Sequence, residues 1–448
     1  MSQSTSNNRL GTMPVGKLLI YMSVPTMFSM LIQALYNIVD SIFVARFSEE
    51  ALTAVSIAFP LQMMLFAFAI GMNTGTCSVI SRRLGAGNEK GASLAAETGY
   101  TIDLCLYCLF VLIGLFLSRP FVSLYVSGPE LSGMSVTYLR ICLSISIGVF
   151  IATFCEKTIQ ATGNTIQPMI IQGCGAIFNI VMDPILIFGY FGLPAMGVKG
   201  AAVATVMGQC FSMILGIFFL KKNKYVKFRF TRPHFDKDSI SDIMKVGLPA
   251  VVMQGIGTIM TAAMNAIVIT FNVLATTAFG VYFKLQSFVF MPVFGLNSGL
   301  LPIVGFNYGA RNRERMMKAL KLGMVIAFVI MSTGTVVFNL FPDALLGMFN
   351  ASGDMIAIGE KCLRTISLSF PIASISIIAM SLFQAKGDGY LSMIVSIVRQ
   401  LGILIPSAWL LGHFFGLDAV WYSFVIAEVV ALIISLSFFR MELKRIDF

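Results

Sequence analysis

The sequence predicts an all-α polytopic membrane protein with twelve transmembrane helices in two homologous six-helix lobes. Two observations support this fold class. The chain of 448 residues is 57% hydrophobic and only 12% charged, a composition typical of proteins that cross a bilayer several times. Apolar stretches of about 20 residues, each long enough to span hydrocarbon, alternate with polar breaks. Helices are expected because a helix satisfies its own backbone hydrogen bonds in lipid.

The second half of the sequence repeats the first half in register. Pro25 pairs with Pro249, and Gln160 pairs with Gln384, each 224 positions apart. The same shift relates Gly71, Asn73, Gly75, Gly85, Ala86 and Asn88 to Gly295, Asn297, Gly299, Gly309, Ala310 and Asn312. A period of half the chain predicts two homologous lobes, whereas a solenoid has far shorter repeats. Six spans per repeat make the lobes point the same way, related by a parallel pseudo-two-fold axis along the membrane normal.

The expected spans follow one another along the chain between polar breaks. They begin near Val15, Ala51, Ser93, Met134, Thr165 and Gly197 in the first half, and near Ile240, Ala275, Arg315, Met355, Tyr390 and Leu417 in the second. The predicted organisation is a cytoplasmic tail (1–14), an N-terminal lobe (15–221), a cytoplasmic linker (222–239), a C-terminal lobe (240–442) and a short tail (443–448).

Cations gather in alternate loops and predict the orientation of the chain. Arg82 and Arg83, the connector from Lys221 to Lys237, and Lys444 with Arg445 would all lie on one side. Because Lys and Arg stay cytoplasmic, both termini are expected in the cytoplasm of a cell membrane. The basic connector is interpreted as facing anionic lipid and not nucleic acid.

No feature of the sequence indicates an enzyme or a resident cofactor. There is no G-x-x-x-x-G-K-[ST] motif and no soluble stretch large enough for an ATPase domain. The eight cysteines fall inside predicted spans and show no zinc spacing. A two-lobed protein of this kind is expected to alternate access to the two sides, driven by an ion gradient, without an obligate protein partner.

Two aspartates within predicted spans are the candidate ion-coupling residues. Asp40 shares a helical face with Gln33 and Asn37, because four and three residues separate them. Asp183 follows Asn179 by one turn in the fifth span, and Thr205 of the sixth span is expected at a similar depth. Ionisable groups are costly in a membrane, so each is a candidate functional residue.

This oxygen-rich set suits either a proton shared between carboxyls or a hard monovalent cation such as sodium on Asp40, Asn179 and Asp183. The residues do not choose between the two ions. The equivalent positions in the second lobe are Met264 and Ser407 for the two aspartates, so the ion chemistry is expected in the first lobe alone.

Other residues are candidates for a substrate cavity or for structural and gating roles. Polar, aromatic and thioether side chains make adaptable cavity walls, and the cavity candidates are Gln33, Tyr36, Met63, Met253, Gln254, Thr258 and Phe288. Small residues let helices approach closely and proline loosens a span, so the structural candidates are Pro25, Gly71, Gly75, Gly295 and Gly299, with Glu156 near a helix end.

The sequence resembles the multidrug and toxic compound extrusion transporters, known as the MATE family, along essentially its whole length. The matching motifs are Pro25 with Asn37-x-x-Asp40, Arg82-Arg83-Leu-Gly-Ala-Gly-Asn88, Gln160-Ala-Thr-Gly163, Asn179-x-x-x-Asp183-Pro184 and Gly200-Ala-Ala-Val-Ala-Thr205. The resemblance implies a V-shaped, twelve-helix exporter that exchanges organic cations for protons or sodium, with Asp40, Asn179 and Asp183 at the ion site. Some members have an acidic residue in the seventh span, where this chain has Gln254.

Two other transporter classes share parts of this pattern. A lipid-linked oligosaccharide flippase of the same superfamily would need several cavity cations for a pyrophosphate, and the second half offers mainly Lys284 and Arg399. A major-facilitator transporter would have a different loop after its second span. The sequence therefore favours the multidrug antiporter and keeps the flippase as the alternative.

Overall fold

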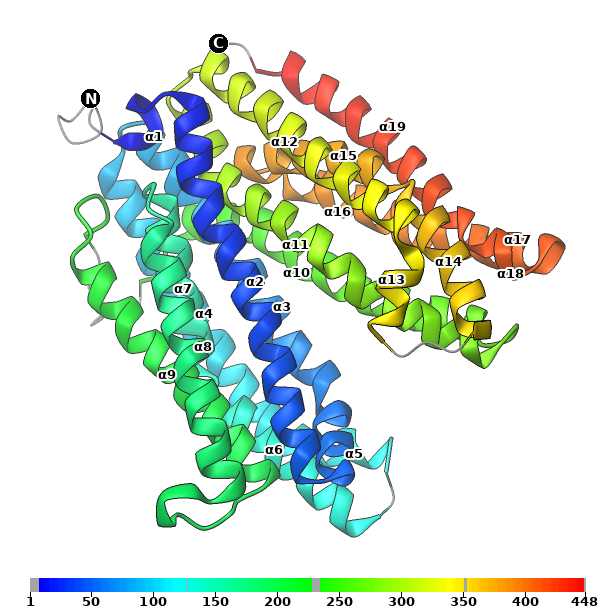
Figure 1. Cartoon of the computed structure of the whole chain (residues 1–448). Helices are drawn as coiled ribbons and strands as arrows, with labels where there is room; N and C mark the ends of the chain where they lie inside the picture. The colour runs from blue at the N-terminus through cyan, green and yellow to red at the C-terminus, as the bar shows by residue number, and fades with distance from the viewer. Residues whose placement is uncertain (1–7, 127, 228–233, 350–352, 447–448) are drawn as a thin grey trace. The chain divides into compact units, whose positions relative to one another are not determined.

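The computed structural model describes residues 8–126, 128–227, 234–349 and 353–446, and within them it is helical with no β-strand. Figure 1 shows that each part of the chain consists of helices, most of them long. They are α1 (Arg9–Thr12), α2 (Val15–Phe47), α3 (Glu49–Gly85), α4 (Glu89–Leu112), the π-helical turn η2 (Ile113–Leu117), α5 (Ser118–Ser123), α6 (Pro129–Ser144), α7 (Ile147–Ala161), α8 (Ile166–Phe188), the 3₁₀ turn η3 (Tyr190–Gly192), α9 (Val198–Lys221), α10 (Lys237–Val268), α11 (Val273–Gly309), α12 (Arg313–Leu340), α13 (Pro342–Gly347), α14 (Gly353–Ser367), α15 (Phe370–Lys386), α16 (Gly389–Ile397), the π-helical stretch η4 (Val398–Leu404), α17 (Ile405–Phe415), α18 (Leu417–Val420) and α19 (Tyr422–Lys444). The all-helical prediction is confirmed.

The described residues contain ten helices long and apolar enough to cross a membrane, and up to twelve when each bent pair counts as one span. The bent pairs are α6 with α7, at 43°, and α14 with α15, at 45°. They occupy the fourth and tenth expected spans, the same place in each repeat. Pro371 lies in the first turn of α15, where a missing N–H is tolerated. The twelve predicted spans are thus present, two of them broken.

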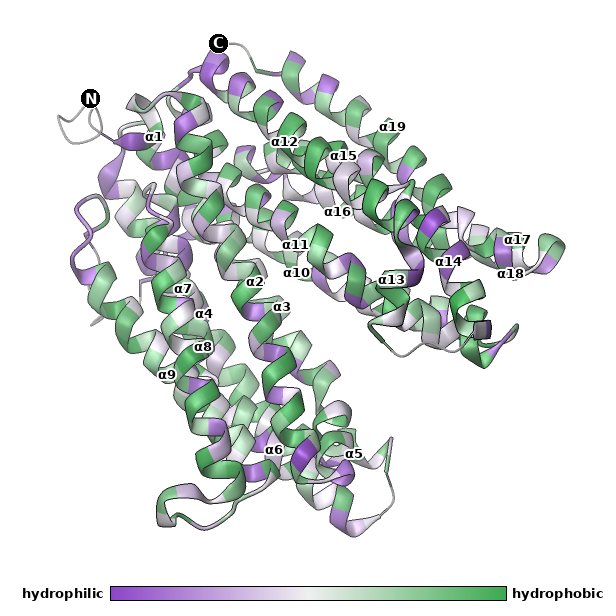
Figure 2. Cartoon of the chain, viewed as in Figure 1, coloured by the Kyte–Doolittle hydropathy of each residue, from purple (hydrophilic) through white to green (hydrophobic). Residues whose placement is uncertain are grey.

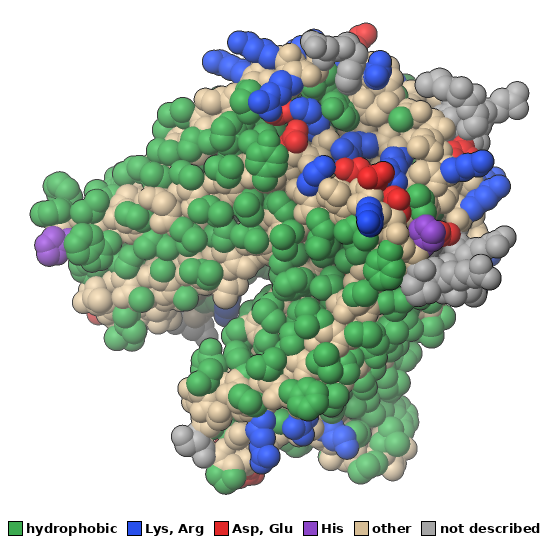
Figure 3. Space-filling model, turned by 180° about the vertical axis from the view of Figure 1, so that it is seen from behind, with side chains coloured by type: hydrophobic (Ala, Val, Ile, Leu, Met, Phe, Trp, Pro, Cys, Tyr) green, Lys and Arg blue, Asp and Glu red, His purple; other side chains and the backbone are tan. Residues whose placement is uncertain are grey.

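Hydropathy along the helices fits a membrane protein. Hydrophobic residues follow the lengths of the helices, and hydrophilic residues gather towards their ends (Figure 2). The space-filling view shows broad hydrophobic surfaces, with Lys and Arg gathered in groups apart from them (Figure 3). Large side chains such as Phe116 and Ile214 are exposed, as expected where lipid and not water is the solvent.

The chain forms two compact units that share two helices. Unit 1 is centred on residues 28–251, and unit 2 contains residues 9–27 and 252–448. The boundaries lie within α2 and α10, at positions 224 apart, two residues after Pro25 and Pro249. The lobes predicted from the repeat, 15–221 and 240–442, stay a prediction, because the repeat and the contacts divide the chain at different points. Parts of the predicted tails and linker lie outside the described residues.

Repeated glycines mark close helix approaches within each unit. In unit 1, a Cβ atom on Gly71 of α3 would lie 2.6 Å from the backbone nitrogen of Val251 in α10. In unit 2, a Cβ atom on Gly299 of α11 would lie 2.8 Å from the carbonyl oxygen of Met22 in α2. Because the backbones touch at these points, only glycine fits. The glycine pairs therefore hold the first half of α10 in unit 1 and the first half of α2 in unit 2.

The repeated Gly-Ala-x-Asn turns end long helices and start the next ones. Asn88 caps α4 by accepting from the N–H of Gly91 at 2.7 Å, and Asn312 caps α12 by accepting from the N–H of Arg315 at 3.0 Å. Such caps satisfy N–H groups that a helix leaves unpaired. Arg315 also donates to the carbonyl of Met13 at 2.7 Å, which ties the start of α2 to α12.

An equivalent tie in unit 1 fixes the start of α10. Arg83 donates to the hydroxyl of Ser239 at 2.7 Å and pairs with Asp242 at 3.5 Å. Ser239 in turn donates to Asp236 through both its N–H and its hydroxyl. These two hydrogen bonds lower the pKa of Asp236 below its ordinary value, so the carboxyl group of Asp236 is ionised at neutral pH.

Candidate ion-coupling site

Three helices of unit 1 carry the predicted ion-coupling residues. Asp40 lies in the second half of α2, Asn179 and Asp183 lie in α8, and Thr205 lies in α9. The helices α8 and α9 approach closely at Gly208, where a Cβ atom would lie 2.9 Å from the Cβ atom of Asn179. Small residues at this contact bring Thr205, less than one turn away, to the level of the aspartates.

The two carboxyl groups meet directly. The side chains of Asp40 and Asp183 lie within hydrogen-bonding reach of each other, and Asn179 donates from Nδ2 to Oδ1 of Asp183 at 3.4 Å. Asp183 is fully buried and Asp40 is partly buried. Tertiary packing therefore brings together residues that lie more than 130 positions apart in the sequence.

The cluster offers oxygen acceptors that no protein donor satisfies. Among the described residues, Oδ1 of Asp40, Oδ1 of Asn179 and Oδ2 of Asp183 are buried without a hydrogen-bond partner. No Lys or Arg is among the groups that interact with either carboxyl in the described chain. Two adjacent buried carboxylates repel each other and cannot both stay ionised without a cation. The arrangement therefore suits one shared proton or one bound monovalent cation.

Tyrosine hydroxyls complete the surroundings of the carboxyl pair. Tyr36, one turn before Asp40, lies close to the hydroxyl of Thr205 and near both carboxyls. Tyr138 of α6 lies near Asp40 and close to Gln62 of α3. Tyr36, predicted as a cavity residue, belongs to this cluster. Sequence reasoning missed Tyr138 and Gln62, because neither shares a helix with an acidic residue of the site.

Of the remaining predicted residues of unit 1, some lie near the carboxyl pair and others do not. Gln33 accepts a hydrogen bond from Gln172 of α8 at 3.4 Å, two turns from Asp40 on the same face. Asn37 is exposed, and Met63 is partly buried in α3. Glu156 is partly buried beside Lys157 in α7. The structure thus brings Gln33 towards α8 and leaves Asn37 outside the cluster.

The predicted residues of unit 2 form no comparable cluster. Gln254 and Thr258 of α10 and Phe288 of α11 are exposed, and Met253 is partly buried. Pro25 lies buried inside α2. None of these predicted positions carries a carboxyl, so they form no pair like that of unit 1.

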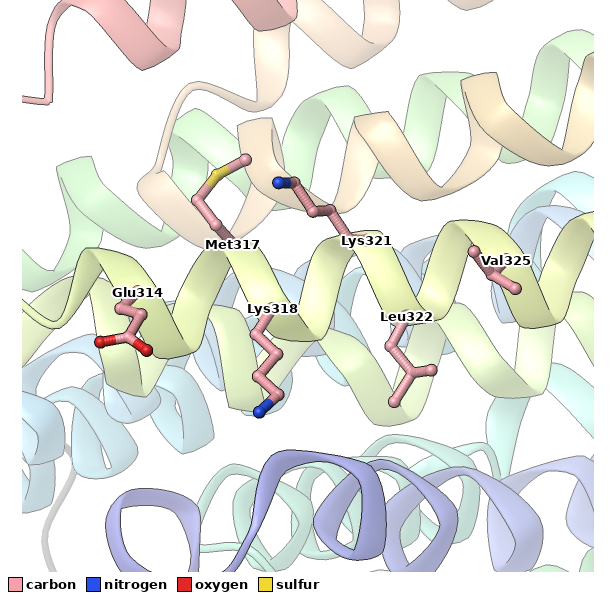
Figure 4. Close-up of a pocket in the computed structure, with 6 residues that line it drawn as sticks. All are labelled: Glu314, Met317, Lys318, Lys321, Leu322 and Val325. Atoms are coloured by element: carbon pink, nitrogen blue, oxygen red, sulfur yellow. The ribbon is translucent and has the colours of Figure 1, made fainter.

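A shallow, open surface depression in unit 2 lies along the start of α12. Its lining is Glu314, Met317, Lys318, Lys321, Leu322 and Val325. Figure 4 shows Lys318 and Lys321 pointing to different sides of the helix. Charged residues at the helix start and apolar ones further along are typical of the edge of a membrane, and no carboxyl pair is present there.

Comparison with known proteins decides the family. The MatE family model matches residues 25–185 and 249–410, one match in each repeat. This chain belongs to the MatE family. Probable multidrug resistance protein YoeA of Bacillus subtilis is 24% identical over 94% of this chain and 93% of its own length. Multidrug export protein MepA of Staphylococcus haemolyticus is 25% identical over 94% and 92% of the two chains.

A solved structure agrees with the sequence match. An outward-facing multidrug resistance MATE family transporter of the MOP superfamily superposes with a TM-score of 0.90 at 27% identity, covering 98% of each chain. The MatE protein described here is therefore a multi-pass membrane transporter and not an enzyme. The major-facilitator alternative is excluded by the same match.

The hydroxyl of Tyr36 provides a test of the MatE site. In Tyr36→Phe the ring stays and the hydroxyl beside Thr205 and the two carboxyls is lost, so the pair keeps its neighbours but loses one polar contact. One lost hydrogen bond is worth about 1 kcal/mol. We expect ion-driven drug efflux to fall by roughly fivefold at unchanged expression, measured as initial rates in proteoliposomes.

The Tyr36 test has a control on the same helix. Tyr21, in the part of α2 that belongs to unit 2, contacts Arg9 instead of a carboxyl. Tyr21→Phe should leave the rate unchanged. Equal rates for wild type and Tyr36→Phe would contradict a role for this hydroxyl.

Proposed function

We propose that this MatE protein is a secondary active multidrug exporter, which exchanges organic, often cationic, compounds for protons or sodium ions by alternating access. The carboxyl pair of Asp40 and Asp183 carries this proposal. It is the place where the described membrane helices hold two acidic groups in direct contact with acceptor oxygens left unpaired. Such a pair binds a proton or cation more tightly than either carboxyl alone.

Exchange follows if ion and drug stabilise different states of unit 1. An ion at the pair removes the repulsion between Asp40 and Asp183, so α2 and α8 hold together. Its departure leaves two carboxylates in contact, which drives the helices apart. A drug that binds better to the separated arrangement is then coupled to the ion through a shared equilibrium, and the coupling is reciprocal.

The membrane setting completes the proposal. The cationic loops support an orientation with both termini in the cytoplasm of a cell membrane, with lipids as neighbours and small organic compounds as substrates. The names of YoeA and MepA refer to multidrug resistance and multidrug export, which supports the same substrate class here. No cofactor is required, because the gradient supplies the energy.

The experiment is efflux of a lipophilic fluorescent cation from proteoliposomes of purified wild type. A pH gradient and a sodium gradient are imposed separately, each with the membrane potential clamped. Efflux driven by one of them supports the antiporter and names the ion. Movement of the cation that follows only its own gradient, in protein shown to be folded, would contradict ion coupling.

The flippase alternative loses support from the second unit. Arg399 of η4 is paired with Glu428 of α19 at 3.1 Å, so its charge is already neutralised. Lys284 is exposed and lies 5.9 Å from the ring of Phe349. A pyrophosphate would meet one free ammonium instead of several. Flipping of a lipid-linked oligosaccharide by reconstituted protein, without drug efflux, would reverse this preference.

A further inference from the structure

The helix α12 of unit 2 presents one open face along much of its length. The depression at its start lies between two rows of side chains spaced four residues apart, which are Glu314, Lys318 and Leu322 in one row and Met317, Lys321 and Val325 in the other. A second depression continues on the same side of the helix, lined by Phe328, Val329, Ser332, Thr333 and Val336. The residues that line the two depressions form what we call the α12 face. It is charged at the start of the helix and mainly apolar further along.

The other side of α12 packs in the core of unit 2. Met316, Leu320 and Ala327 are fully buried there, whereas Val325 and Phe328 of the α12 face are exposed. In a membrane protein, an exposed apolar face of this kind is in contact with lipid. The α12 face is therefore left over from the packing of the helix and is available to a partner from the bilayer.

Two lysines flank the start of the α12 face. Lys318 and Lys321 are exposed, and their side chains stand on different sides of the helix (Figure 4). Neither forms an ion pair within the described part of the chain. The carboxylate of the same lining, Glu314, lies in the first turn of α12, where the unpaired N–H groups of a helix favour a negative charge. The two ammonium groups are therefore available to bind an anion.

The start of α2 lies beside this end of α12 and adds a third cation. A Cβ atom on Gly16 would lie 3.7 Å from Cδ2 of Leu322. Lys17 follows Gly16 in the sequence and is exposed, and Ile20, about one turn further, is exposed as well. The two neighbouring helices of unit 2 thus have the same order along their lengths, with cations first and exposed apolar side chains after them.

In unit 1, main chain covers part of the equivalent face of α4. The N–H of Lys227 donates to the hydroxyl of Ser93 at 3.1 Å, and the N–H of His234 donates to the hydroxyl of Thr101 at 3.0 Å. Ser93 and Thr101 lie two turns apart on α4. The connector that follows α9 is therefore held against this face of unit 1 through two side-chain hydroxyls.

Three substitutions between the repeats change what this face can bind. The pairs, each 224 positions apart, are Ser93 with Met317, Glu97 with Lys321, and Thr101 with Val325. Methionine and valine have no hydroxyl, so α12 cannot hold main chain as α4 does. The third pair exchanges a carboxylate for an ammonium. A face that binds peptide in unit 1 is thus apolar and cationic in unit 2, which are the properties that match an anionic lipid.

We propose that the α12 face binds an anionic phospholipid of the cytoplasmic leaflet. The headgroup phosphate lies between Lys318 and Lys321, and the acyl chains run along the apolar side chains from Leu322 towards Val336. One leaflet of hydrocarbon is about 15 Å thick, which about ten residues of helix cover, so this stretch is long enough. The cationic turn before α12 is cytoplasmic under the proposed orientation, which names the leaflet.

Native mass spectrometry of the purified protein tests the lipid. Protein stripped of lipid in detergent is titrated with dioleoyl phosphatidylglycerol or with dioleoyl phosphatidylcholine, which share their acyl chains and differ in net charge. We expect the first phosphatidylglycerol to bind roughly 20-fold more tightly, because each of two lysines contributes about fivefold in affinity for an anionic headgroup. Equal affinities of wild type for the two lipids would overturn the proposal.

Charge variants locate the binding site. Lys318→Gln combined with Lys321→Gln should remove the preference for phosphatidylglycerol, and the corresponding pair of arginine substitutions should keep it. Lys221 and Lys224 are exposed in unit 1, so Lys221→Gln combined with Lys224→Gln removes the same charge elsewhere and should bind like wild type. A wild-type preference in the first glutamine pair, or an equal loss in the control pair, would overturn the proposal.

Glycerol phosphate tests whether the acyl chains are needed. It carries a phosphate without the chains, and an excess of about 100-fold over the lipid should not displace bound phosphatidylglycerol. Displacement would make this a phosphate site and would contradict a lipid site. All four lysines are exposed, so thermal unfolding should show folded variants. None of these measurements involves transport, so their outcome is separate from that of the antiport.

Discussion

Replacing Asp40 by asparagine is expected to abolish ion-driven drug efflux, with a loss of about 100-fold in initial rate. The variant keeps the shape of the side chain and the contact with Asp183, but it removes the carboxyl that makes the pair. A single remaining carboxyl has no like-charged neighbour, so ion binding no longer changes the repulsion between α2 and α8. The measurement is efflux from proteoliposomes under the gradient that drives wild type.

An exposed carboxylate at the start of α3 provides the control for Asp40. Glu50 is exposed and belongs to the same unit, and Glu50→Gln removes one negative charge without touching the pair. It should transport like wild type. If Asp40→Asn retained driven efflux at the rate of Glu50→Gln, the carboxyl pair would have no part in coupling.

Replacing Gly299 by alanine is expected to destabilise the protein by about 2 kcal/mol. The added Cβ atom would lie 2.8 Å from the carbonyl oxygen of Met22 and 2.9 Å from the Cα atom of Ser23. Both are backbone atoms, so the first half of α2 must move away from α11. Unfolding in detergent, followed by heat or denaturant, measures the loss.

The matched control for Gly299 lies in the same helix. Gly280 of α11 is exposed and would place its Cβ atom in open space, with nothing within 4 Å. Gly280→Ala should be neutral or stabilising by up to about 1 kcal/mol, because alanine favours the helix. Equal effects of the two substitutions would show that the close approach at Gly299 does not hold α2 in unit 2.

Composition and the repeat were enough to predict the helical fold, because both can be seen in the sequence without knowledge of any tertiary contact. Apolar length predicts spans, and the shift of 224 residues pairs Gly71 and Gly75 with Gly295 and Gly299 before any contact is known. The breaks in the fourth and tenth spans were not predicted, since hydropathy is the same in a straight and a bent helix. The division of α2 and α10 between units was also out of reach, because it depends on contacts far apart in the sequence.

The candidate site was predictable where its residues share a helix with a charge. Asp40 and Tyr36 are one turn apart in α2, and Asn179 and Asp183 are one turn apart in α8, so helical periodicity groups each pair. Tyr138 and Gln62 join the site by tertiary packing alone. Asn37 shows the opposite case, since it shares the helix with Asp40 but is exposed. Successive residues of a helix are about 100° apart around its axis. Spacing of three or four residues therefore shows only that two side chains share a broad face, and it does not show which of them is buried.

The most direct test of the account is to count the ions released when drug binds to purified protein. Calorimetry of drug binding in buffers of different ionisation enthalpy reports protons, and the dependence of drug affinity on sodium reports sodium. We expect wild type to release a proton or to bind drug more weakly in sodium, and Asp40→Asn to do neither. Drug binding of equal affinity in both proteins, with no ion released and no effect of sodium, would contradict a shared ion site at Asp40 and Asp183.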